Sequence, residues 1–298
     1  MTNPASPLIQ FSDALSGLAA GARPFLAEIR TADGHRLSGV LWKPNAVVVS
    51  EQALPDASEY EVRVADQLVK AHLAGRDEGT NVAVLKLESD IAAALPPAAV
   101  PRTGALALAL GMSANGITAR LAVVGSVGGA WESLAGGTID HRITLDSPVR
   151  GSEEGGPVLA GDGAILGIST RGPRRQGLVI PASTIERVVA VLLEKGSIQR
   201  GWLGVALRPV ALPETLRPDD SQRVGLMVMD VGADSPAARA GILAGDILLS
   251  AGGVPATRFG RIARQLGPNS IDTRIEITLA RAGVIIASEA TITARKAG

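Results

Sequence analysis

The stretch that decides the fold is Leu145–Thr170, which reads LDSPVRGSEEGGPVLAGDGAILGIST. A Gly-Gly-Pro turn at residues 155–157 leads into alternating apolar runs. Glycine lacks a side chain and tolerates unusual backbone angles, so another group can approach the backbone closely here. The stretch therefore predicts a loop that was built to lie against a partner.

The composition limits the class of protein. With 298 residues the chain is long enough for about two domains. Hydrophobic residues make up 46% of the chain and aromatic residues only 2%, which favours β-rich cores of Val, Ile, Leu and Ala. Basic and acidic residues both number 29, so no net charge favours a nucleic-acid partner. There is no Cys and only three scattered His, so we predict neither a metal site nor a cofactor.

Residues 1–24 are predicted to form an N-terminal helical segment. Apolar residues recur there at spacings of three and four, which is typical of an amphipathic helix that ends near Gly21. The segment lacks a basic start and its apolar positions are interrupted, so we expect neither a signal peptide nor a membrane span. This predicts a cytoplasmic location.

Short β-strands are predicted from Phe25 onward. About a dozen apolar runs, separated by turn signals such as Asp-Gly and Pro-Asp, precede residue 182 and indicate a pair of β-barrels over residues 25–198. A helix follows, with Ser183 as its predicted N-cap, Glu186 completing a capping box, and Gly196 at its end. A second domain is predicted over residues 201–298.

The Leu145–Thr170 stretch resembles the nucleophile loop of trypsin-like serine proteases of the HtrA or Deg type. In that family an Asp, five residues and then Gly-Asn-Ser-Gly-Gly-Pro occur, and Asp146 matches the Asp without a gap. The same alignment puts Ser152 at the first Gly, Glu153 at the Asn and Glu154 at the nucleophilic Ser. The resemblance implies a mostly β protein with a trypsin-like double β-barrel.

The other two triad positions are also substituted in this alignment. AVVVSEQALPDA resembles the segment that carries the catalytic His, and its His position is Gln52. TNVAVLKLE resembles the strand that carries the catalytic Asp, and its Asp position is Asn81. An amide cannot accept the nucleophile's proton, and an amide in place of the Asp cannot hold and stabilise an imidazolium. We therefore predict no catalytic residue among Gln52, Asn81 and Glu154, with an altered oxyanion loop at Ser152 and Glu153.

Residues 201–298 resemble the PDZ domain that follows the protease domain in this family, and SPAARAGILAGDILLSAGG is the most specific part. PDZ domains bind extended C-terminal peptides at a sheet edge, with loop N–H groups receiving the terminal carboxylate. The predicted loop and strand residues are Gly201, Trp202, Leu203, Gly204 and Val205, and the predicted helix residues are Phe259, Ile262 and Leu266. The alternative is that these are ordinary core residues of a domain that binds nothing.

Three functions follow from the resemblance. The first is a catalytically inactive scaffold that binds protein C-termini or unfolded peptides, in protein quality control or in regulating an active relative. The second is an active endopeptidase with an unrecognised nucleophile, and the third is a purely structural subunit. Relatives commonly form trimers through the N-terminal segment, so a homo-oligomer with contacts at Phe11 and Leu15 is expected. Many relatives are exported, so removal of a leader would make the location periplasmic.

The two consecutive carboxylates in the loop have two interpretations. One carboxylate, with Glu154 favoured, could fold back onto the N–H groups of residues 151–155 and fill the oxyanion hole. Alternatively, both side chains point to water and the loop has collapsed.

Overall fold

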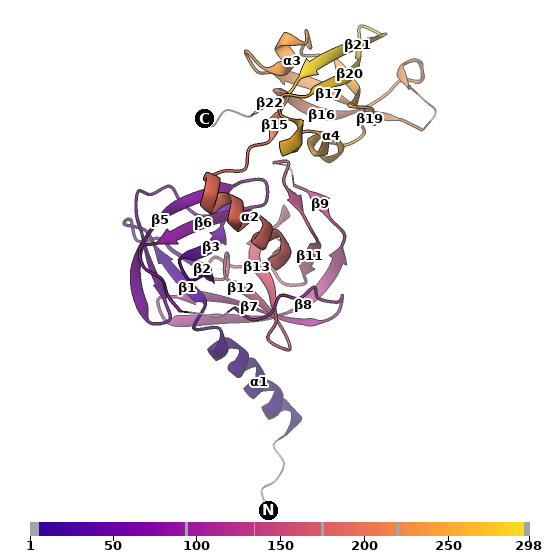
Figure 1. Cartoon of the computed structure of the whole chain (residues 1–298). Helices are drawn as coiled ribbons and strands as arrows, with labels where there is room; N and C mark the ends of the chain where they lie inside the picture. Colours follow the sequence, from indigo (N-terminus) through magenta and orange to yellow (C-terminus); the bar gives the residue numbers. More distant parts are fainter. Residues whose placement is uncertain (1–5, 93–94, 134, 174–175, 219–220, 295–298) are drawn as a thin grey trace, which may run out of the picture. The chain divides into compact units, whose positions relative to one another are not determined.

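The computed structural model describes residues 6–92, 95–133, 135–173, 176–218 and 221–294 (Figure 1). They form two compact units. One unit consists of the chain up to Trp131 and of Ile139–Ile198, and the other of Glu132–Thr138 and the chain from Gln199 onward. The sequence places residues 132–138 in the barrel domain, whereas in the structure they group with the second unit.

The first unit contains two closed six-stranded barrels, which confirms the predicted double β-barrel. Runs of Val, Ile, Leu and Ala form its strands, and β3 is buried along its whole length. The first barrel has the order β1(Leu26–Arg30), β2(Arg36–Lys43), β3(Ala46–Ser50), β6(Val82–Leu87), β5(Gln67–Asp77), β4(Tyr60–Val64). The second has the order β11(Arg142–Leu145), β14(Gly177–Pro181), β13(Ile165–Arg171), β12(Pro157–Ala160), β7(Leu106–Ser113), β8(Gly116–Gly128). The 3-10 turn η1(Glu51–Ala53) follows β3. The strands β9(Trp131–Glu132) and β10(Thr138–Ile139) form a short separate pair.

Helix α2(Ala182–Lys195) packs on β5, β6 and β13 of the first unit. The predicted cap was wrong: the N-cap is Pro181, two residues before Ser183, because Pro181 ends β14 with a fixed φ and Ser183 already lies in the first turn. Glu186 does not complete a capping box but accepts a hydrogen bond from the Trp42 indole N–H at 2.7 Å. The predicted end at Gly196 is confirmed, since this residue has a left-handed φ of 73°.

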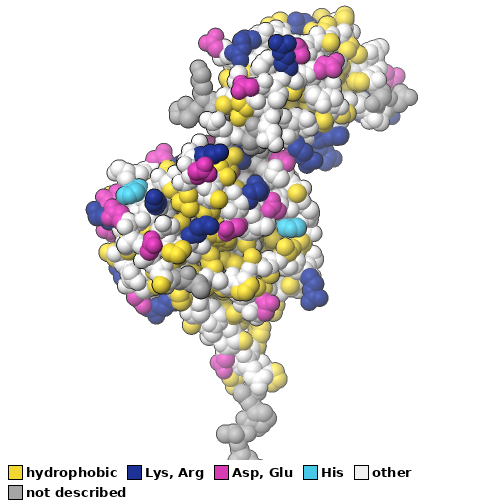
Figure 2. Space-filling view, in the orientation of Figure 1, with side chains coloured by type: hydrophobic (Ala, Val, Ile, Leu, Met, Phe, Trp, Pro, Cys, Tyr) yellow, Lys and Arg dark blue, Asp and Glu magenta, His cyan; other side chains and the backbone are white. Residues whose placement is uncertain are grey.

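The N-terminal helix α1(Pro7–Gly21) extends from the first barrel (Figure 1). Leu15 and Leu18 pack against the barrel core, but no residue of the helix is buried. Leu8, Ile9 and Phe11 are exposed. No helix in the described part of the chain is long and apolar enough to cross a membrane. Charged side chains of both signs are interspersed on the face shown in Figure 2.

The second unit is built around one sheet with the order β16(Val205–Ala211), β17(Val224–Val231), β18(Ile247–Ala251), β20(Arg274–Arg281), β21(Val284–Thr291). The other elements are β15(Gly201–Trp202), β22(Thr293–Ala294), β19(Val254–Pro255), α3(Pro236–Arg239), α4(Phe259–Gln265), η3(Glu214–Leu216) and η4(Pro268–Ser270). Gly252 and Gly253 have positive φ angles of 56° and 73°, as the hairpin between β18 and β19 requires. The buried Asp246 carboxylate accepts two hydrogen bonds from Arg281, each 2.7 Å long, and this pairing lowers its pKa.

Candidate functional site

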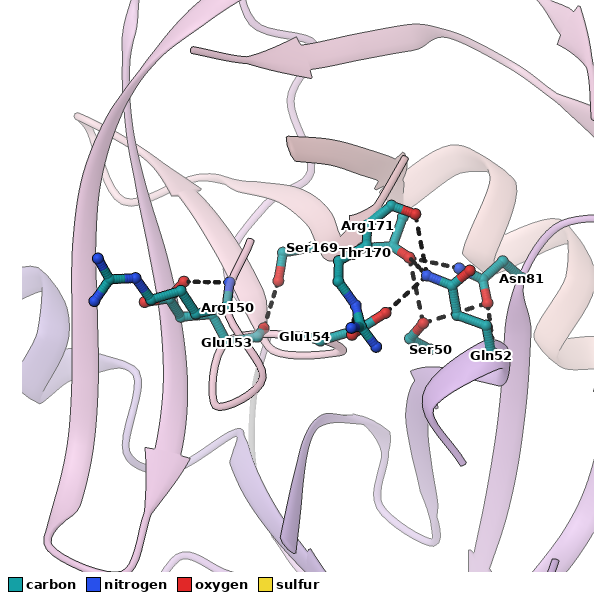
Figure 3. Close-up of polar contacts among 9 residues, drawn as sticks. All are labelled: Ser50, Gln52, Asn81, Arg150, Glu153, Glu154, Ser169, Thr170 and Arg171. Atoms are coloured by element: carbon teal, nitrogen blue, oxygen red, sulfur yellow. Dashed lines mark hydrogen bonds and ion pairs between the residues drawn. The ribbon is translucent and has the colours of Figure 1, made fainter. Parts of the chain in front are cut away.

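The three predicted triad positions lie together between the two barrels of the first unit (Figure 3). Gln52 is in η1 directly after β3, Asn81 precedes β6, and Glu154 lies in the turn before β12. The Gln52 side-chain amide donates to Glu154 Oε1 at 2.7 Å, and the Gln52 backbone N–H donates to Asn81 Oδ1 at 2.8 Å. The arrangement of positions expected from the resemblance is therefore present, with different chemical groups.

Thr170, at the end of β13, joins these residues. Its Oγ1 accepts from Gln52 Nε2 at 2.8 Å and from Asn81 Nδ2 at 2.6 Å, and lies 3.3 Å from Ser50 Oγ. Asn81 has a left-handed φ of 57°, a conformation that Asn tolerates better than most residues. The network consists of amides and hydroxyls, and no histidine takes part in it among the described residues.

Glu154 is turned away from solvent, with only 1% of its surface exposed. Its Oε1 accepts from Gln52 and its Oε2 lies 2.5 Å from Nε of Arg171. The carbonyl of Arg171 accepts a further hydrogen bond from Gln52 Nε2 at 3.1 Å. The carboxylate thus has an amide partner and a cationic partner, as a buried charge requires.

Glu153 points to the opposite side of the same turn and is equally buried (Figure 3). Arg120 of β8 donates two hydrogen bonds of 2.8 Å to its carboxylate, and the backbone N–H of Arg150 donates a third at 3.0 Å. Ser169 Oγ donates to the Glu153 carbonyl. Such a two-pronged Arg–carboxylate pair is among the stronger charge-assisted contacts in proteins.

The loop N–H groups are taken by backbone carbonyls. The N–H groups of Glu153 and Glu154 both donate to the Arg150 carbonyl, at 3.0 and 3.1 Å, and that of Gly155 donates to Ser169 at 2.8 Å. The Ser152 carbonyl accepts from Ser38 Oγ at 2.7 Å. The Ser152 carbonyl oxygen lies so close to Gly111 that a Cβ atom added to Gly111 would be 1.7 Å from this oxygen.

Both interpretations of the consecutive carboxylates were wrong. Glu154 does not fold back onto the loop N–H groups, because Gln52 and Arg171 offer its charge better partners. Neither side chain points to water, because both are buried against cations. The Arg150 carbonyl, and not a carboxylate, accepts from the N–H groups of Glu153 and Glu154, and the Glu154 N–H is one that would otherwise face an oxyanion.

In the described part of the chain, neither Ser152 nor Ser50 has a general base beside its hydroxyl. Ser152 Oγ lies 3.4 Å from Thr118 Oγ1, and Ser50 Oγ contacts only the amide of Asn81 and the hydroxyl of Thr170. A nucleophilic hydroxyl needs an adjacent base to remove its proton. Among the described residues, no group of three or more His, Cys, Asp or Glu could hold a metal ion.

A second candidate site is a cavity of about 250 Å³ in the second unit. All eight residues predicted for a peptide groove line it: Gly201, Trp202, Leu203, Gly204, Val205, Phe259, Ile262 and Leu266. Leu207 and Ala263 add apolar surface, so a hydrophobic side chain fits the cavity. Within the described residues, the N–H groups of Leu203 and Gly204 donate to no acceptor.

The loop at this cavity depends on Gly204. Its φ is +84°, and a Cβ there would lie 2.2 Å from the Cβ of Ser235. The ring of Trp202 lies beside Gly204 and Gly232, so this side chain supports the loop as well as lining the cavity. The carbonyls of Leu203 and Gly204 accept from Ala237 and Gly232, each at 2.9 Å. The loop is therefore held from one side while its N–H groups stay available.

Comparisons with known proteins match both domains. Residues 37–168 match the trypsin-like peptidase domain, and residues 227–281 match the PDZ domain. A probable periplasmic serine endoprotease, DegP-like, from Brucella suis biovar 1 is 30% identical over 226 residues, 72% of this chain and 44% of that protein. The chain belongs to the HtrA/DegP family. A protein of the same name from Pseudomonas savastanoi is 30% identical over 258 residues, 83% of this chain and 53% of that protein.

Solved structures of the HtrA type match along nearly the whole chain. The serine endoprotease from Yersinia pestis has a TM-score of 0.74 and 25% identity, covering 99% of this chain and 100% of that one. The HtrA-type protease AlgW with a tripeptide has a TM-score of 0.73 and 26% identity, covering 97% and 98%. The chain spans about half the length of the curated relatives that it matches.

Several residues of this HtrA-type site were missed at the sequence level. Thr170 and Arg171 end the stretch quoted at the start, but its spacing gives no sign that they contact Gln52. Arg120 is one of many basic residues on a half-exposed strand, and nothing in its neighbourhood indicates Glu153 as its partner. In the PDZ groove, Leu207 could have been found from alternation, since it follows Val205 by two residues on one strand.

The unequal surroundings of the two carboxylates give a testable difference. We expect Glu153→Gln to lower the free energy of unfolding by about 3 to 5 kcal/mol, because it leaves Arg120, only 22% exposed, without its counter-charge. Glu154→Gln should cost about 1 to 3 kcal/mol, because Arg171 is 52% exposed and stays hydrated. Urea unfolding of the full chain at pH 7 measures both, with the exposed Glu88→Gln as control. Equal costs, or a larger cost for Glu154→Gln, would contradict this assignment of partners.

Proposed function

We propose that this chain is a catalytically inactive HtrA/DegP-type protein that binds protein C-termini or unfolded peptides through its PDZ groove. The observation that carries the proposal is the amide–carboxylate network at the triad positions, where Gln52 donates to Glu154 and, among the described residues, no histidine or carboxylate accepts from Ser50, Ser152 or Thr170. Loss of one triad member alone costs on the order of a thousandfold or more in rate. Three substitutions together with a closed oxyanion turn leave no recognisable route to hydrolysis.

The groove supports the binding half of the proposal. The cavity is apolar and lies beside two N–H groups, of Leu203 and Gly204, that have no acceptor among the described residues. It therefore suits a chain end that carries a hydrophobic side chain and a carboxylate. AlgW, one of the similar structures, has been solved with a tripeptide and with a decapeptide. A role in protein quality control, or in regulating an active relative, is the setting we propose for such binding.

Location and assembly are part of the same proposal. Relatives named as periplasmic favour the periplasm over the cytoplasmic location expected from the sequence. We also propose a homo-oligomer, with a trimer as the expected form, that buries the exposed apolar side chains of α1, including Phe11. Light scattering at micromolar concentration should give a multiple of the 30.4 kDa chain mass, and Phe11→Ser should reduce it. A monomer mass for the unmodified chain would contradict the proposed homo-oligomer.

The inactive state is tested against the rival endopeptidase. We expect no cleavage of unfolded casein and no labelling by a serine-directed fluorophosphonate, because no described hydroxyl at the site has a base. Labelling that disappears in the Ser152→Ala variant would establish an unrecognised nucleophile and overturn the proposal. An active HtrA-type protease assayed in parallel controls for the substrate and the label.

Peptide binding separates the scaffold from a purely structural subunit. A library of ten-residue peptides ending in Val, Leu, Ile or Phe should contain ligands, and amidation of the terminal carboxylate should weaken them roughly tenfold or more. Phe259→Ala, in the cavity wall, should weaken binding, whereas Val284→Ala, an exposed residue of β21, should not. A library without a single ligand would favour the structural subunit.

A further inference from the structure

Strand β16, which borders the PDZ cavity, is the edge strand of its sheet. In the described chain β16 pairs only with β17, and its residues Val205 and Leu207 line the cavity opposite α4. An edge strand offers unpaired backbone groups to an incoming chain. How long a peptide it can pair with depends on which residues direct those groups outward.

The hydrogen bonds at the two ends of β16 show which of its residues direct their backbone groups outward. Gly232 N–H donates to the Gly204 carbonyl at 2.9 Å, so this carbonyl faces β17 and the backbone groups of Val205 face outward. At the other end, Leu212 N–H donates to the Arg223 carbonyl at 2.9 Å, so Leu212 faces β17. Counting back by alternation, Ala211 and Pro209 face outward.

The middle of the strand agrees with this count. Leu207 lies opposite Val228, whose N–H and carbonyl are both used on the β18 side, with Asp246 and Gly245 at 2.8 Å each. The backbone groups of Leu207 are therefore not hydrogen-bonded to Val228. They face outward, toward the free edge of the sheet. The free edge accordingly presents Val205, Leu207 and Pro209 in succession.

Pro209 interrupts the row of donors. Proline has no N–H, and its ring occupies the place where that hydrogen would point. Pro209 is exposed, so no other element covers this part of the edge. A carbonyl of an incoming strand would find no N–H donor at this position. It would instead face the proline ring.

We propose that the groove pairs with only the last three or four residues of a C-terminal peptide, and that Pro209 sets this limit. The inference rests on the proposed peptide-binding function. A carboxylate at the N–H groups of Leu203 and Gly204 places the last ligand residue beside Val205. An antiparallel ligand then has its third-from-last residue beside Leu207 and its fifth-from-last beside Pro209.

The consequence is recognition of a short chain end and not of an extended segment. The terminal apolar side chain enters the cavity, and Leu207 supplies one N–H and one carbonyl to the third-from-last residue. Beyond that point the ligand backbone leaves the sheet edge. Proteins with different upstream sequences but similar chain ends would therefore bind alike.

The test uses the tightest ligand of the library, shortened from ten residues to six, four and three with its free C-terminus kept. For the unmodified full chain, the dissociation constant measured by calorimetry should stop improving at four residues. Pro209→Ala should tighten the ten-residue peptide roughly two- to tenfold, the range for one net hydrogen bond, and leave the three-residue peptide unchanged. Pro213→Ala, another exposed proline that follows the strand, is the matched control and should change neither.

Two results would overturn the limit while leaving the groove in place. One is an affinity of the unmodified chain that rises tenfold or more between four and ten residues. The other is a Pro209→Ala variant that binds the short and long peptides with the same change, or with none. Absence of binding at every length removes the proposed function itself and this inference with it.

Discussion

The need to compensate the buried charge of Glu153 governs the loop on which the rest of the site depends. Arg120 and the Arg150 N–H hold that carboxylate beneath the second barrel, and Ser169 holds its carbonyl. With Glu153 fixed there, the chain from Arg150 to Glu154 forms a tight turn around the Arg150 carbonyl. A buried carboxylate without such partners would cost several kcal/mol, so the turn and the ion pair stabilise each other.

Once the turn is formed, Glu154 can only extend toward the other barrel. There it meets Gln52 of the first barrel, while Arg171 of β13, in its own barrel, supplies the cation, and the amide network around Thr170 continues to Asn81. The three predicted triad positions meet here, and each of their side chains has a hydrogen-bond or ionic partner within the site. In the PDZ groove, by contrast, the N–H groups of Leu203 and Gly204 have no acceptor among the described residues.

The sequence predicted the fold and the meeting of Gln52, Asn81 and Glu154, because strand periodicity and motif alignment fix which segments neighbour each other. It could not predict the orientation of the two glutamates. Their partners, Arg120 and Arg171, lie 33 and 17 residues away in the chain, and only barrel closure brings them to the loop. The Ser183 cap failed for a local reason, because Pro181, two residues earlier, is the N-cap and the helix begins at Ala182.

The central claim is that the Glu154 N–H donates to the Arg150 carbonyl and not to a substrate oxygen. A crystal structure of the full chain, grown with a peptide boronic acid at millimolar concentration, tests it most directly. We expect no boronate at this loop, with Glu154 between Gln52 and Arg171 and the turn around the Arg150 carbonyl intact. A boronate bound at this loop, with the N–H groups of Ser152 and Glu154 directed at its oxygen, would contradict the account.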